Sequence, residues 1–189
     1  MQISLWKRFS YSVSVTAFVA VAATAYASGP SVRTVQLRDD CDPATFNLAL
    51  GRGSCVGDGD TAFPDFLDQV LSQGSADKWR MNPDKTNAER GVNAQNRGGE
   101  LHSFTNVPHF GGGFVELLNL GVEPLEQCAA RTPDGVLIRD DQGNLVPAQA
   151  AIASFVPPGQ NGKTTELKKG VYKFQCCIHP WMHTTIEVK

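Results

Sequence analysis

The sequence carries no excess of positive charge, which argues against a protein that binds nucleic acid. Its 189 residues contain 17 Lys and Arg against 19 Asp and Glu, for a net charge of −2. Binding to a phosphate backbone depends on basic side chains. Internal repeats and long low-complexity tracts are also missing, so the length fits one domain of ordinary size.

A long uninterrupted apolar run is missing as well. Residues 9–23 are largely apolar, but four serine and threonine residues interrupt them, and the run is too short for a comfortable bilayer span. Lys7 and Arg8 precede this run, and small residues ending at Ala27 follow it. The pattern predicts a signal peptide over residues 1–27, with a membrane anchor as the alternative.

A signal peptide of this kind predicts that the protein is exported to the periplasm or out of the cell. Residues 28–189 would form the mature chain, with a net charge of −4 and no membrane span. Outside the cytoplasm cysteines tend to pair. The sequence has five cysteines, so one is left for another role.

Two short helices are predicted near the N-terminus, in an insert over about residues 42–74. Asp42 precedes a proline, which is typical of a helix N-terminus. The second helix shows apolar residues at i, i+3, i+4, i+7 and i+8 from Phe63, with Asp60 or Thr61 as N-cap.

Short strands separated by glycine- and proline-rich turns are predicted for most of the remaining chain. The segments are 32–37, 78–81, 91–96, 100–107, 151–156, 164–167, 170–176 and 184–189. A hairpin is expected within 136–146, and the rest of 114–147 reads as a long loop. This pattern is typical of an antiparallel β-sandwich or barrel.

Two pairs of acidic residues are expected to lie in solvated turns without a functional role. They are Asp39 with Asp40, and Asp140 with Asp141. The triple glycine at 111–113 is also read as a turn, because it lacks the lysine and the strand-to-helix context of a phosphate-binding loop.

The adjacent cysteines at the end of the segment GVYKFQCC are distinguished by strand alternation. Successive residues of a strand point to opposite faces. Tyr172, Phe174 and Cys176 share one face, and its aromatic character indicates the core. Cys176 is therefore expected to point inward and Cys177 to point the other way.

Cys176, His179 and Met182 form the pattern CxxHxxM, which indicates a metal site. Thiolate, imidazole and thioether are soft ligands that select copper. Zinc is the main competitor, but it prefers four strong ligands, and methionine is a poor one. The alternative without metal is a disulfide cysteine, a surface histidine and a core methionine.

A trigonal His₂Cys copper site needs a second histidine. The candidates are His102, His109 and His183. His102 lies in a strand-like segment and is favoured. His109 is expected in an exposed loop, and His183 directly follows Met182, where alternation would turn it away from the metal.

The segments NRGGELHSFT (96–105) and YKFQCCIHPWMHTTIEV (172–188) together resemble the cupredoxins, or blue copper proteins. The metal loop is most similar to those of amicyanin and plastocyanin. The resemblance implies a mainly β, Greek-key cupredoxin-like sandwich over residues 28–189. Short helical insertions near the N-terminus and a long loop before the C-terminal strands would be additions to that fold.

The resemblance implies that one copper ion is held by His102, Cys176 and His179, with Met182 as the axial ligand. The other four cysteines allow three pairings. The preferred pairing joins Cys41 with Cys55 and Cys128 with Cys177.

The implied function is that of an exported one-electron carrier that alternates between Cu(II) and Cu(I) and serves an unidentified redox partner. His179 is expected to present its outer ring edge near the surface. Pro180 and Trp181 would surround it as an apolar docking patch, although Trp181 could equally pack beneath the loop.

Two other functions use the same ligands. Copper sequestration or delivery without electron transfer is one alternative. An enzyme with further copper centres is not expected, because no two histidines are separated by one residue. Gln175 and Cys177, rather than histidines, flank Cys176.

Overall fold

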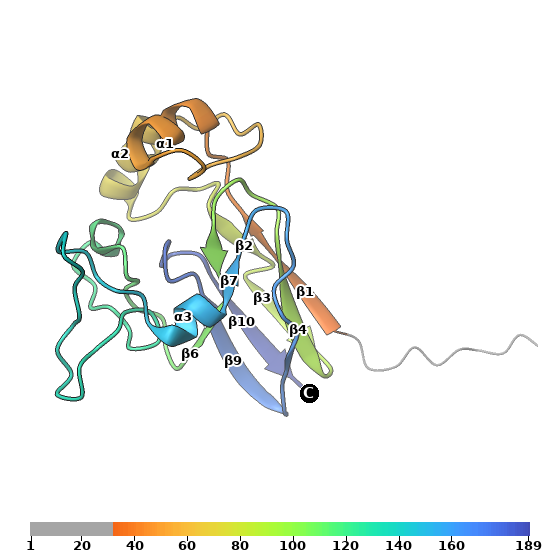
Figure 1. Ribbon diagram of the computed structural model, residues 1–189. Helices are drawn as coiled ribbons and strands as arrows, with labels where there is room; N and C mark the ends of the chain where they lie inside the picture. The colour runs from red at the N-terminus through yellow and green to blue at the C-terminus, as the bar shows by residue number, and fades with distance from the viewer. Residues whose placement is uncertain (1–31) are drawn as a thin grey trace, which may run out of the picture.

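The computed structural model describes residues 32–189, so the predicted signal peptide lies outside the described residues. Two four-stranded sheets pack against each other, with the helices α1 (Pro43–Leu50) and α2 (Phe63–Gln73) at one end and the C-terminus at the other (Figure 1). One sheet has the order β2-β1-β4-β8, formed by Arg80–Asn82, Val32–Arg38, Gly91–Asn96 and Thr165–Glu166. The other has the order β3-β10-β9-β6, formed by Lys85–Ala88, His183–Val188, Gly170–Gln175 and Thr105–Val107. The prediction of a mainly β fold with short N-terminal helices is confirmed.

The sheets are mixed, which corrects the expectation of a purely antiparallel fold. β1 runs parallel to β4, from the pair Val32 and Gly91 to the pair Leu37 and Asn96. β3 also runs parallel to β10, while β9 pairs antiparallel with both β10 and β6. Parallel neighbours need a long connection. The chain between β1 and β4 supplies one because it contains the helical insert.

Both predicted helices are present. α1 spans Pro43–Leu50, and the carboxylate of Asp42 accepts hydrogen bonds from the first backbone N–H groups. α2 spans Phe63–Gln73 and ends at Gly74, which has a left-handed φ of 79°. The predicted N-cap of α2 is wrong, since Ala62 occupies that position and the hydroxyl of Thr61 donates to Asp40 instead.

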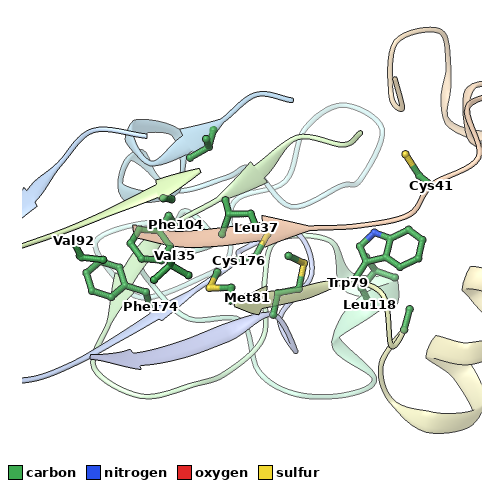
Figure 2. Close-up of a cluster of buried hydrophobic side chains, with 14 of the residues drawn as sticks. Val35, Leu37, Cys41, Trp79, Met81, Val92, Phe104, Leu118, Phe174 and Cys176 are labelled. Carbon is green, nitrogen blue, oxygen red and sulfur yellow. The ribbon is translucent and has the colours of Figure 1, made fainter. Parts of the chain in front are cut away.

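The main hydrophobic core lies between the sheets (Figure 2). Val35 and Leu37 come from one sheet, and Phe174 and Ile186 from the other. Phe104 stacks on Phe174 with ring centroids 4.3 Å apart. The core continues into the helical insert through Phe46, Phe66 and Trp79. The insert is therefore packed onto the end of the sandwich.

A second, smaller core lies under the long loop between β6 and β7. Its buried residues are Val107, Leu125, Cys128, Ala151 and Cys177. The loop contains a 3₁₀ turn at Glu116–Asn119 and the helix α3 at Gln149–Ala153. The strand predicted over 151–156 is therefore wrong for its first half, and only β7 at Phe155–Val156 is extended, paired with β5 at His102–Ser103.

The predicted hairpin within 136–146 is present, since Arg139 pairs with Leu145. Asp140 lies in its turn and accepts hydrogen bonds from the N–H groups of Gln142 and Asn144. Arg139 forms an exposed ion pair with Glu116. None of the helices within residues 32–189 has the length and hydrophobicity that a bilayer span requires.

Candidate metal centre

Three of the predicted ligands lie together at the end of the sandwich nearest the helices. The Sγ atom of Cys176 is 3.8 Å from Nδ1 of His102 and 3.9 Å from Nδ1 of His179. His102 belongs to β5, Cys176 directly follows β9, and His179 lies in the loop before β10. Each of the three residues is at most 2% exposed. Their potential ligand atoms lie within 4.8 Å of one another, so the three side chains could hold a metal ion.

These distances can be tested against metal geometry. Bond lengths of about 2.3 Å to sulfur and about 2.05 Å to nitrogen place S and N about 3.8 Å apart at 120°, and about 3.6 Å apart at the tetrahedral angle. The observed 3.8 and 3.9 Å fit the trigonal arrangement. The three side chains are therefore spaced so that one metal ion could contact the sulfur and both imidazole nitrogens.

Met182 is fully buried at the base of the same loop. Its N–H donates to the carbonyl of His179 at 2.9 Å, and its carbonyl accepts from the N–H of Cys176 at 2.9 Å. These two bonds close the loop so that Cys176, His179 and Met182 remain close together. Met182 also belongs to the main core.

The other two histidines lie outside this group. His183 stacks on Phe110 with ring centroids 4.0 Å apart, and burial lowers the pKa of its imidazole. His109 is exposed in the loop after β6.

The sulfur of Cys176 lies in surroundings that favour a thiolate. Burial alone would raise its pKa, but hydrogen bonds and charge from His102 and His179 lower the pKa of the thiol well below its usual value. The N–H of Ser103 also donates to the sulfur at 3.4 Å. Cys176 is the one free cysteine among the described residues.

Asp39 is buried, so the expectation that it lies in a solvated turn is wrong. Its side chain is 1% exposed, and Nε2 of His102 donates to its Oδ2 at 2.7 Å. Burial opposes charge on both groups. Even so, their mutual hydrogen bond, assisted by Cys176, raises the pKa of His102 to about 10, and contact with His102 lowers the pKa of Asp39 to about 2.

A second carboxylate lies behind His179. Oε2 of Glu100 is 3.6 Å from Nε2 of His179, and the indole N–H of Trp79 donates to the same oxygen. Burial raises the pKa of Glu100, while the neighbouring His179 and Trp79 oppose that shift. Both imidazoles therefore face sulfur on one side and a carboxylate on the other.

The glycines before Glu100 allow this arrangement. A Cβ atom at Gly98 would overlap the carboxylate of Asp39, and one at Gly99 would overlap the carbonyl of Val56. The N–H of Gly99 instead donates to Asp39 at 2.8 Å. Glycine is required here for close approach of the chain to Asp39.

His179 is covered, contrary to the expectation of a surface-facing ring edge. It is 2% exposed. The ring of Phe66 in α2 meets it edge-on at 6.1 Å, and Trp181 lies 5.6 Å away. The helical insert explains the difference, because α2 and Trp79 occupy the space where solvent was expected.

Pro180 and Trp181 are half-buried beside this cover. The indole N–H of Trp181 donates to the carbonyl of Trp79 at 3.2 Å. The two residues line a shallow groove together with His183, Phe110, Leu120 and Val122. The groove thus gives the loop that carries His179 a partly exposed apolar surface.

The structure contains the disulfides Cys41–Cys55 and Cys128–Cys177. Cys176 and Cys177 face opposite cores, as strand alternation predicts. Cys177 is nevertheless fully buried, because the long loop covers its side of the strand.

Asp39 and Glu100 were missed as site residues by the sequence analysis. Glu100 lies two residues before His102, so strand alternation places both on one face and could have identified it. Asp39 had no comparable local signal.

No protein-family model matches this chain, and no curated protein matches it. Several solved structures are similar to part of it. A purple cupredoxin from Nitrosopumilus maritimus has 15% identity and a TM-score of 0.34, over 60% of this chain and 86% of that one. The amicyanin of Paracoccus versutus (Thiobacillus versutus) has 13% identity and a TM-score of 0.32, over 60% and 76% of the two chains. A reduced amicyanin variant has 16% identity and a TM-score of 0.33, over 60% and 77%. At values this low, the chemistry of the site must be judged from this chain's own residues.

Proposed function

We propose that this protein binds one copper ion through His102, Cys176 and His179, with Met182 as the axial ligand, and acts as a one-electron carrier. The observation that carries the proposal is the spacing of the three buried ligand atoms, 3.8 and 3.9 Å from sulfur to nitrogen. A copper ion held there would accept and release one electron by alternating between Cu(II) and Cu(I).

The chain supports this role by fixing the ligands before any metal binds. The backbone bonds between Cys176, His179 and Met182 close the loop. The N–H of Ser103 binds the sulfur, and Asp39 holds the ring of His102. A rigid, dry site of this kind changes little between oxidation states, which favours rapid electron transfer.

The burial of the ligands favours retention of copper over delivery. All three side chains are at most 2% exposed, and α2 covers His179. A delivery protein needs ligands that a recipient can reach. Delivery would instead predict rapid loss of copper to a competing chelator, whereas sequestration would predict slow loss without a reversible one-electron wave.

We also propose that residues 28–189 form a single exported domain after removal of residues 1–27. Placement in the periplasm or outside the cell agrees with the two disulfides, which form in oxidising compartments. The redox partner would dock at the groove that includes Pro180 and Trp181 and bury a small area, as transient electron-transfer interfaces do.

The direct test is to add Cu(II) to the purified mature protein and record its visible spectrum. An intense thiolate-to-copper band with one equivalent of copper, lost in Cys176→Ser, is the expected result. His109→Ala should keep the band, because His109 is exposed away from the site. A colourless wild-type protein would refute the copper assignment.

Electron transfer itself requires a second measurement. Voltammetry of the copper-loaded protein should give a reversible one-electron wave, and a chelator should remove copper slowly. A blue protein that shows no reversible wave would favour copper handling, with rapid loss of copper indicating delivery and slow loss indicating sequestration.

A further inference from the structure

Each ligand imidazole has a buried carboxylate on the side away from the sulfur. Asp39 lies 2.7 Å from Nε2 of His102, and its side chain is 1% exposed. Glu100 lies 3.6 Å from Nε2 of His179, and its side chain is 9% exposed. Two acidic groups within one buried site are costly unless other groups hold them.

Both carboxylates are held in place by groups other than the imidazoles. The N–H groups of Gly99 and Glu100 donate to Asp39 at 2.8 and 3.1 Å. The indole of Trp79 donates to Glu100. The carboxylates are therefore fixed features of the site, and the imidazoles meet them in a defined orientation.

This arrangement has two consequences for a bound metal. A histidine that donates its Nε2 proton to a carboxylate presents Nδ1 to the metal and is a more basic ligand. Negative charge beside the site also stabilises the more positive oxidised state, and the effect is larger in a buried environment than in water.

We propose that Asp39 and Glu100 are positioning residues that lower the reduction potential of the bound copper by acting through His102 and His179. The proposal rests on the copper function proposed above. Asp39 has the larger effect because it forms a direct hydrogen bond, whereas Glu100 acts at ion-pair distance.

The test is the reduction potential of copper-loaded Asp39→Asn and Glu100→Gln, measured by spectroelectrochemical titration. Each variant removes one charge with almost no change in side-chain shape. Asp39→Asn should weaken Cu(II) relative to Cu(I) by about tenfold, a rise of about 59 mV for a one-electron couple. Glu100→Gln should cause a smaller rise, and both variants should keep the thiolate-to-copper band.

Asp58→Asn is the matched control. Asp58 is exposed and lines the same surface hollow as Asp39. Loss of the Asp58 charge should leave the reduction potential of the copper unchanged. A rise equal to that of Asp39→Asn would mean a general effect of charge and would overturn the proposal. Unchanged or lowered potentials in both site variants of a blue protein would also overturn it, while leaving the copper function intact.

Asp39→Asn could fail to bind copper, since an amide cannot accept from all four N–H donors that surround the carboxylate, those of Cys41, Gly99, Glu100 and His102. In that case the reduction potential of Glu100→Gln alone tests the proposal, because the amide oxygen of the glutamine can still accept a hydrogen bond from Trp79. A rise in its potential supports the proposal and no rise refutes it. A colourless wild-type protein would refute the copper function and this proposal together.

Discussion

Cys176 and Cys177 are neighbours in the chain but belong to different cores of the protein. The sulfur of Cys176 faces two imidazoles in the main core, while Cys177 is bonded to Cys128 in the smaller one. The thiol proposed as a metal ligand and the structural disulfide are thus separated by one peptide unit, so mutation can test each cysteine separately.

Replacement of Cys128 and Cys177 by serine should destabilise the protein and leave the copper site intact. The disulfide closes a segment with a sequence separation of 49. Its loss should lower the free energy of unfolding by about 4 kcal/mol in the chain-entropy model. Denaturant titration measures this change, and the visible band of the copper-loaded variant should persist. Loss of the band in a folded variant would show that the two cysteines are not independent.

Phe66→Ala should both destabilise the protein and open the cover over His179. Phe66 is 3% exposed and contacts Trp79 and Trp181 as well as His179. The cavity should cost about 3–5 kcal/mol, and a chelator should remove copper faster.

Leu71→Ala is the control on the same helix. Leu71 is 60% exposed, so the free energy of unfolding should change by at most about 0.5 kcal/mol. Equal rates of copper loss from wild type and Phe66→Ala would argue that α2 does not restrict access.

Gln175→Ala should destabilise the strand that leads to Cys176. The buried amide of Gln175 donates to the carbonyl of Gly111 at 2.7 Å and accepts from its N–H at 3.0 Å. Truncation leaves both backbone groups without these partners, at a cost of about 1–3 kcal/mol. Chemical denaturation tests this, with the exposed Gln142→Ala as control. Equal losses in the two variants would contradict a specific role for the amide.

The metal-free protein should lose stability in acid partly through Asp39. The pKa of Asp39 is lowered from 3.8 to about 2 in the folded state, so the unfolded chain binds protons first as the pH falls. The stabilisation is fully present above about pH 4 and is lost as the pH falls through about 2. It amounts to about 2 kcal/mol.

Urea titrations of wild type and Asp39→Asn at several pH values measure this contribution. The difference in unfolding free energy between the two proteins should shrink towards acid pH. A constant difference would mean that Asp39 does not titrate with the lowered pKa.

Features that depend on neighbouring residues were predictable from the sequence. Alternation along β9 separates Cys176 from Cys177, and the pattern CxxHxxM predicts that Cys176 and His179 lie close together, as they do. The two helices follow from Asp42 and from the apolar spacing after Phe63. Each inference uses a signal that lies within a few residues.

Features that depend on packing between distant segments were not predictable. The burial of His179 follows from where α2 packs against the end of the sandwich. The contact between Asp39 and His102 joins residues 63 positions apart. An acidic pair before a cysteine resembles any solvated turn until its surroundings are known.

β1 contains no ligand, yet it ends next to the residue that holds His102. Its six paired positions with β4 fix where the chain emerges at Asp39. A slip of one residue in that pairing would withdraw the carboxylate while every ligand stayed in place. If the proposed copper site is correct, two proteins with the same four ligands would differ in reduction potential through the pairing of their first strand alone.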